Sequence, residues 1–298
     1  MNNLLEKNIN EVNEMLIKSL DDLPPLPETI QKLQEYIATH GSNIVIDEIA
    51  NIISTDPLIT ANLLHLTNSA YYGFSKEIKT VNQALVLLGV SNVKNMIIAD
   101  YAKSSFVINL SPYGIETDRF LTLIHEQTNF ISTWLIEEDR ILCYNLIPCV
   151  MMLRLGIMVF SNFLIQNNID KKFLLHLSKN NFNNILRLER EFLGVDHISF
   201  LSNLFKVWNL DEDLIEIISS LDYLGSTSAK VKKETYALAA IEALFSPEKN
   251  AYDDFCVQKA YQILKDGKAN GVDFNLENFL NKLPEKFIEI LSKSKEQL

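Results

Sequence analysis

The chain has 298 residues, and 38 acidic against 27 basic side chains give it a net charge of −11 with histidine neutral. A hydrophobic fraction of 47% with 22% charged residues is ample for a sizeable core and excludes wholesale disorder. The negative charge argues against general nucleic-acid binding, which needs a basic face. The scarcity of Gly (9) and Pro (8) favours long helices over a turn-rich β-sandwich.

Cysteine spacing and hydropathy predict a cytoplasmic protein without membrane insertion. The three cysteines form no C-x-x-C motif, which argues against a disulfide framework or a zinc knuckle. The amino terminus lacks the pattern of a signal peptide. The most apolar stretch, 141–165, is interrupted by Pro148 and Arg154. A central Arg costs roughly 2.5–3.5 kcal/mol on insertion scales, so we interpret this stretch as a buried core helix.

Apolar residues at helical spacing predict most of the first half of the chain to be helical. The predicted ranges are 2–19, 28–39, 46–54, 57–68, 81–88 and 91–104. The proline-rich segment 20–28 separates the first two helices. Asp56 and Pro57 form an N-cap and first-turn pair, because the carboxylate accepts free N–H groups and Pro needs no donor there.

The second half also reads as helical, and 111–118 is its clearest boundary. Helices are predicted at 119–137, 143–165, 182–192, 196–208, 211–222, 231–245, 253–266, 276–283 and from Pro284 onward. No segment shows sustained period-two alternation, so the predicted fold class is all-α. The expected organisation is an N-terminal helix (1–19), a first helical lobe (20–110), a helical bundle (119–222) and C-terminal helices (231–298) packed on the bundle.

An ordered set of short motifs carries a family resemblance. It includes L-P-P-L-P at 23–27, Asp56-Pro57-Leu58, N-S-A-Y-Y-G at 68–73 and Leu88-Gly89, with Ile49-Ala50, Ile53, Leu63-Leu64, Ile78, Thr80 and Ala84 between them. In order and spacing the set resembles the HDOD domain, a bacterial signalling-output module, over roughly 20–222. The resemblance implies a two-lobed helical fold related to the HD metal-dependent phosphohydrolases, with an HD-like bundle in the second lobe.

The resemblance also implies that the metal site of the HD enzymes is degenerate here. An HD hydrolase needs an adjacent His-Asp pair in an apolar helix, and Leu153 and Arg154 stand at those positions. Leu offers no donor atom, and the fixed charge of Arg repels a metal ion. His125 falls where the upstream metal-binding His is expected, although a lone His on a helix is more often simply hydrogen-bonded. We therefore expect no metal, no cofactor and no catalysis.

Other motif residues have a structural interpretation beside the functional one. Asp196 and His197 resemble the family's later motif, but they also fit an N-cap and first turn. Trp208 is expected to be a core anchor. The pair Tyr71 and Tyr72 is either an exposed recognition pair or helix-end packing. Within the same turn, Asn68 and Ser69 cap backbone groups, and Gly73 supplies a positive φ.

These patterns favour a non-catalytic regulatory module in a bacterial signalling pathway, for example one controlling motility or a second messenger. It would act through contacts with signalling proteins, and self-association remains open. The alternatives are a divergent metal-dependent phosphohydrolase and a nucleotide or phosphate sensor in which Arg154 faces an anion. Because an unpaired buried guanidinium is costly, we expect Arg154 to pair with a carboxylate, for which Glu126, Asp196 and Asp222 are the candidates.

Overall fold

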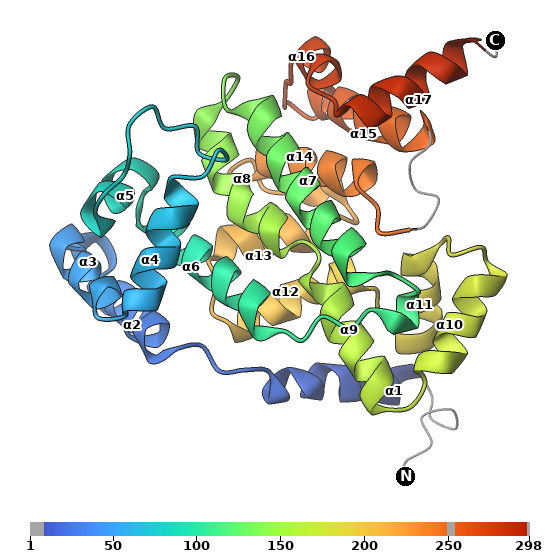
Figure 1. Ribbon diagram of the computed structural model, residues 1–298, viewed down its shortest axis with the longest axis horizontal. Coiled ribbons are helices and arrows are strands. Elements are labelled where there is room, and N and C mark those ends of the chain that lie inside the picture. Colours follow the sequence, from blue (N-terminus) through green and yellow to red (C-terminus); the bar gives the residue numbers. More distant parts are fainter. Residues whose placement is uncertain (1–8, 249–253, 297–298) are drawn as a thin grey trace.

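The computed structural model describes residues 9–248 and 254–296. Across these residues every regular element is a helix, which confirms the predicted all-α class. Figure 1 shows a group of helices at one side of the molecule and a larger bundle beside it. The predicted beginning of the first helix lies partly on residues 1–8, outside the described residues.

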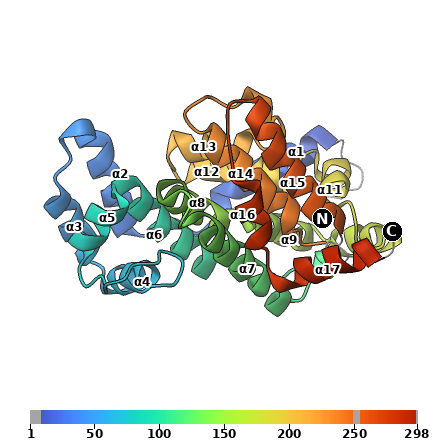
Figure 2. The same ribbon diagram turned by 90° about the horizontal axis from the view of Figure 1, so that it is seen from above.

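The first lobe is a compact helical group that precedes the bundle in the sequence. Its helices are α2 (Glu28–His40), α3 (Ile46–Ser54), α4 (Pro57–Thr67), α5 (Val81–Leu88) and α6 (Val90–Ser105). α6 is mostly buried because it packs on α2, α4 and α5 of its own lobe and on α8 of the bundle. Figure 2 shows the first lobe beside the bundle, with α6 between the two.

The bundle and the C-terminal helices form the rest of the molecule. They are α7 (Thr117–Leu135), α8 (Arg140–Met152), α9 (Leu155–Gln166), α10 (Asp170–Lys179), α11 (Ile185–Leu193), α12 (His197–Val207), α13 (Glu212–Ser219), α14 (Lys232–Leu244), α15 (Asp254–Ala269), α16 (Leu276–Asn281) and α17 (Glu285–Glu296). α14 packs against α8, α13 and α15, and so joins the C-terminal helices to the bundle.

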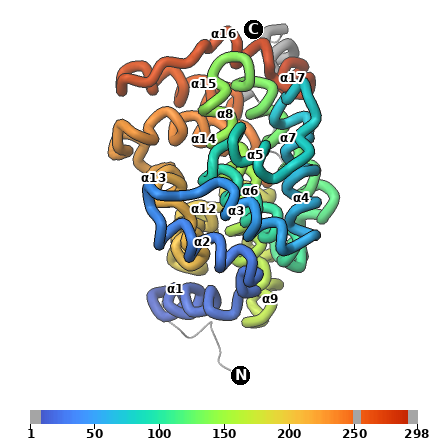
Figure 3. Tube along the Cα trace, turned by 90° about the vertical axis from the view of Figure 1, so that its left-hand side faces the viewer, coloured from blue at the N-terminus to red at the C-terminus, as the bar shows by residue number. Residues whose placement is uncertain are grey.

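The N-terminal helix α1 (Ile9–Lys18) packs on the bundle rather than on the first lobe that follows it. Its Asn13 side chain donates to the carbonyl of Leu193 at the end of α11 (3.4 Å). Figure 3 shows α1 at the opposite end of the molecule from α16 and α17. The proline-rich segment leads from α1 to α2, and Tyr101 on α6 donates to the carbonyl of Pro25 (2.8 Å).

The structure departs from the predicted helices most clearly in two places. The single helix expected at 143–165 is two helices, α8 and α9, with Leu153 and Arg154 at the break. α10 was not predicted, because on this short helix only Phe173 and Leu177 are buried and the buried stripe is therefore brief. The segment Arg140–Gln166 is apolar enough to span a membrane, but 83% of its most apolar window is buried inside the protein, as a core segment requires.

Gly156 sets the distance between α9 and α12. A Cβ atom at this position would lie 2.1 Å from the carbonyl oxygen of His197, which is closer than real Cβ atoms come. Only a glycine therefore allows the first turn of α9 to reach the first turn of α12. This contact positions His197 at the centre of the bundle.

Candidate functional site

Buried side chains occupy the two positions that the family resemblance equates with the His-Asp pair. Leu153 and Arg154 are both 0% exposed. The Arg154 Nε donates to Oε1 of Gln127 on α7 (3.1 Å), and its Nη2 donates to the carbonyl of Phe245 at the end of α14. Gln127 in turn donates to the carbonyl of Val150 on α8 (2.7 Å). The guanidinium therefore ties α7, α14 and the α8–α9 break together.

These residues do not fit a divalent metal ion. Leu153 has no donor atom, and the charge of Arg154 lies where the second ligand of an HD pair would stand. In residues 9–248 and 254–296 no three His, Cys, Asp or Glu side chains come close enough together to hold a metal. The chemistry of an HD hydrolase, in which a metal activates water, cannot be derived from this arrangement.

The three carboxylates proposed as partners of Arg154 are engaged with other cations, so that prediction was wrong for these candidates. Glu126 pairs with Lys286 of α17. Asp196 and Asp222 both pair with Arg190, at 2.6 and 3.1 Å. The expectation that Arg154 is buried is confirmed, and its guanidinium donates to oxygens of Gln127 and Phe245.

His125 lies on the other side of α7 from the Arg154 contact. It is exposed, and two residues along a helix place it about 200° around the axis from Gln127. Its Nδ1 is 2.5 Å from the hydroxyl of Tyr71. His125 therefore joins α7 to the turn after α4, and the structure does not bring it together with Leu153 and Arg154.

The turn after α4 is held by its own side chains. The Asn68 side chain exchanges hydrogen bonds with the main chain of Ile78, at 2.7 and 2.8 Å. The expected cap by Ser69 was wrong: its Oγ is buried without a hydrogen-bond partner among the described residues, and only its main-chain N–H donates, to the carbonyl of Leu66 (3.0 Å). Gly73 has a φ of +57°, and Tyr72 is only 1% exposed. This geometry confirms helix-end packing for Tyr72.

Two predicted N-caps are confirmed. Asp56 Oδ1 accepts the first free N–H groups of α4, at 2.9 and 3.1 Å, and Pro57 occupies the first helical position. Asp196 Oδ1 does the same for α12, at 3.0 and 2.9 Å. Trp208, the C-cap residue that follows α12, is 3% exposed and packs on Phe106, as expected of a core anchor.

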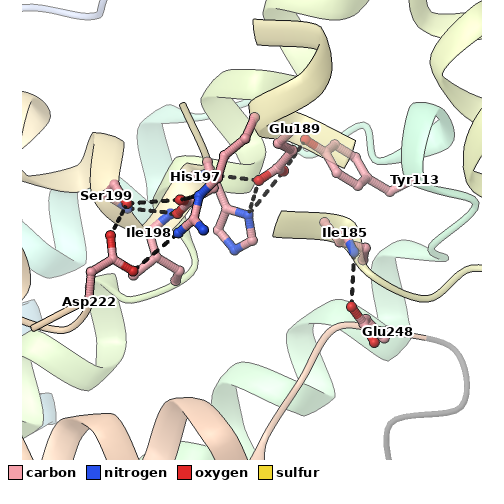
Figure 4. Close-up of polar contacts among 10 residues, drawn as sticks. Tyr113, Ile185, Glu189, His197, Ile198, Ser199, Asp222 and Glu248 are labelled. Carbon is pink, nitrogen blue, oxygen red and sulfur yellow. Dashed lines mark hydrogen bonds and ion pairs between the residues drawn. The ribbon is translucent and has the colours of Figure 1, made fainter. Parts of the chain in front are cut away.

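A buried polar cluster surrounds Glu189, and sequence reasoning did not find it (Figure 4). The carboxylate accepts the Tyr113 hydroxyl (2.6 Å), the main-chain N–H of His197 (2.9 Å) and the Nδ1 of the His197 ring (2.8 Å). All three residues are at most 1% exposed. Burial and the neighbouring carboxylate raise the pKa of Tyr113 well above its ordinary value, so its hydroxyl keeps the proton that it donates.

Asp196 anchors a second network beside this cluster. Burial acts to raise the pKa of Asp196, but hydrogen bonds from Ser199 and Arg190 outweigh it and lower that pKa. Ser199 and Arg190 both also bind Asp222, which lies after α13. Figure 4 shows the two networks on either side of the His197 main chain. Together they fix α11, α12 and the end of α13.

The His197 ring borders a cavity of about 390 Å³ between α11, α14 and α15. Glu248 lies on the same cavity and accepts the main-chain N–H of Ile185 (2.9 Å). Burial raises the pKa of Glu248 above its ordinary value and outweighs the backbone hydrogen bond from Ile185, which acts to lower that pKa. The Nε2 of His197 is buried and lacks a hydrogen-bond partner within the described ranges. We interpret the Glu189 cluster as structural, because all other side-chain polar atoms of Glu189 and His197 make hydrogen bonds within the protein.

Comparison with known proteins agrees with this architecture. The family model of the HDOD domain matches residues 23–222. The structure of a virulence factor from Campylobacter jejuni subsp. jejuni is 48% identical, with a TM-score of 0.62 and coverage of 95% of this chain and 99% of that one. An HDOD domain protein of unknown function from Geobacter sulfurreducens is 18% identical, with a TM-score of 0.59 over 97% and 99% of the two chains.

A curated relative shares a shorter segment. A protein of Treponema pallidum (strain Nichols) is 28% identical over 78 residues. That segment is 26% of this chain and 15% of the Treponema protein, so the chain spans only a small part of that relative's length.

Proposed function

Because this chain belongs to the HDOD domain family, we propose that it is a non-catalytic regulatory module that acts in a signalling pathway through contacts with another protein. The observation that carries the proposal is the buried Arg154. A permanent and fully buried cation, which donates to Gln127 and to the carbonyl of Phe245, occupies the place where a hydrolase would hold its metal. The burial of Arg154 also counts against an anion sensor at this position, because the guanidinium has no exposed surface that a dissolved anion could reach.

Turnover assays test the non-catalytic part of the proposal. Purified protein is incubated with Mn²⁺, Mg²⁺ or Zn²⁺ and with p-nitrophenyl phosphate, bis(p-nitrophenyl) phosphate or a cyclic dinucleotide. We expect no hydrolysis above the rate of heat-denatured protein and less than stoichiometric bound metal. Metal-dependent hydrolysis that disappears in a folded His125→Ala or Gln127→Ala variant would show that the bundle is an enzyme.

Binding measurements test the regulatory part. A partner captured from the native host is purified and titrated against the wild type and against Arg154→Met. The two affinities should agree within about twofold, because Arg154 is buried and a partner meets only the surface. If Arg154→Met keeps the wild-type circular dichroism spectrum but loses the partner, the output depends on the interior site and the proposal fails.

A further inference from the structure

Helix α4 carries apolar side chains that the protein leaves at its surface. They lie all round the helix, a pattern that is typical of a buried helix. Only Leu63 among them is buried, and Leu58 is 70% exposed. Figure 2 shows α4 at the edge of the first lobe. A single exposed leucine is ordinary, but a whole apolar helix at the surface indicates an interaction site.

A groove of about 190 Å³ lies between α4 and α6. α4 contributes residues 58, 59, 62, 63 and 66, and α6 contributes residues 97, 100, 101 and 104. Each set occupies one face of its helix, so the groove follows the seam between the two helices. Leu63 and Ile97, which are 1% and 4% exposed, form its floor. The groove is larger than an engineered cavity of about 150 Å³ that holds benzene, so it can take one large apolar side chain.

Hydrogen bonds within the first lobe fix the walls of the groove. The Asn62 amide on α4 donates to Asp100 on α6 (2.7 Å). Tyr101, also on α6, donates to the carbonyl of Pro25 (2.8 Å) and so holds the proline-rich segment beside the groove. Two of the short sequence motifs, the proline-rich segment and Asp56-Pro57-Leu58, therefore meet at a preformed apolar groove.

The charges of the groove are negative. Asp56 and Asp100 line it, and both are partly exposed. Asp56 accepts main-chain N–H groups of α4 through Oδ1, and Asp100 accepts the neutral Asn62 amide. Within residues 9–248 and 254–296 neither carboxylate forms an ion pair, and the groove has no basic residue in its lining. A partner that combines an apolar side chain with a basic one would complement both features.

We propose that this groove docks an amphipathic helix of a partner protein, which inserts a large apolar side chain and presents lysine or arginine to Asp56 or Asp100. An apolar helix face laid into a groove is a recurrent mode of recognition, and a third helix would extend the packing of α4 on α6. A second copy of this chain fits less well, because a symmetric contact would bring the carboxylates of two grooves together. The inference rests on the proposed function and adds to it the surface and the chemistry of the partner.

Fluorescence anisotropy with a synthetic peptide and the full chain tests the proposal. The probe is a labelled helix of about four turns, with leucine along one face and lysine along the other. One control peptide carries glutamate in place of lysine, and the other carries alanine in place of leucine. We expect saturable binding of the probe and at least about tenfold weaker binding of both controls. No binding of the probe, or equal binding of the glutamate peptide, would overturn the proposal.

Variants locate the site. Leu58→Ser should weaken binding of the probe at least about tenfold, because it removes an exposed wall of the groove. Asp100→Asn should weaken it about threefold at low salt and less at high salt, because salt screens the charge. Ile141→Ser is the matched control, since Ile141 is 74% exposed on α8 and lies outside the groove, and its affinity should stay within about twofold. Unchanged affinity in a Leu58→Ser variant with the wild-type melting temperature would refute the site.

Further measurements separate this inference from the proposed function. A partner of the native host that binds Leu58→Ser as tightly as the wild type refutes the groove and leaves the proposed function standing. Metal-dependent hydrolysis refutes the proposed function, while the probe titration still decides on the groove. Sedimentation equilibrium tests the second copy as occupant. A wild-type dimer that becomes monomeric in Leu58→Ser would overturn the proposal of a partner protein, whereas loss of both the probe and the host partner in Leu58→Ser supports it.

Discussion

Gly156→Ala tests whether the contact between α9 and α12 controls the bundle. In a helix, Ala is favoured over Gly by up to about 1 kcal/mol, so helix propensity alone predicts a more stable protein. The structure predicts the opposite, because the added Cβ would lie 2.1 Å from the His197 carbonyl oxygen and 2.9 Å from its carbon. Both are backbone atoms of α12, which cannot rotate away as a side chain would.

The two effects can be weighed against each other. Relief of the clash requires α9 and α12 to separate by about 1 Å or more, and overpacking of this kind costs up to about 3 kcal/mol. After the gain in propensity, the expected net loss is about 2 kcal/mol. For a chain of this size that corresponds to a fall in melting temperature of about 4 °C.

Thermal and urea unfolding of the two variants provide the measurement. Gly225→Ala is the matched control, since a Cβ there meets nothing within 4 Å, and its stability should stay within about 0.5 kcal/mol of the wild type. A Gly156→Ala protein as stable as the wild type, or more stable, would refute the account of the helix contact.

Three further predictions concern stability. Asp56→Ala should cost about 1 kcal/mol by removing the N-cap of α4, and an unchanged urea midpoint would contradict this. Because the pKa of Asp196 is lowered in the folded state, its stabilisation is present above about pH 4 and is lost as pH falls through the folded pKa. The stability gap between wild type and Asp196→Asn should therefore shrink in acid, and a gap independent of pH would exclude the linkage. Arg154→Ala should lower the free energy of unfolding by about 3 kcal/mol or more, because the side chain is buried. The control Arg187→Ala removes an exposed arginine and should cost less than about 1 kcal/mol. Equal losses in the two variants would disprove burial as the cause.

Local signals in the sequence explain which parts of the fold could be predicted. Asp56 and Asp196 each precede an apolar helix, and an N-cap depends only on the next three residues. Apolar spacing likewise located most helices, because one buried stripe is visible within a single element. It failed at Leu153 and Arg154, where the pattern continues unbroken although the helix does not.

Contacts between distant segments explain what the sequence could not show. Glu189 and Tyr113 are 76 residues apart, and no spacing rule connects them. Gly156 looks like an unfavourable residue in a helix until α12 is placed against it. The acceptors Gln127 and Phe245 of the Arg154 guanidinium were missed for the same reason, because they lie 27 and 91 residues away in the sequence.

The proposed function requires that the bundle keep its fold without a metal, and the chemistry of Arg154 offers a physical reason. A metal in an HD enzyme is a buried positive charge that draws oxygen and nitrogen ligands from several helices. The guanidinium is also a buried positive charge, and it draws oxygens from α7 and from the end of α14. It differs in one respect that decides function: its donors are N–H groups fixed by the chain, so no coordination position is left for water or a phosphate oxygen. On the proposed function, an arginine here therefore preserves the packing of the bundle without supplying the means of hydrolysis.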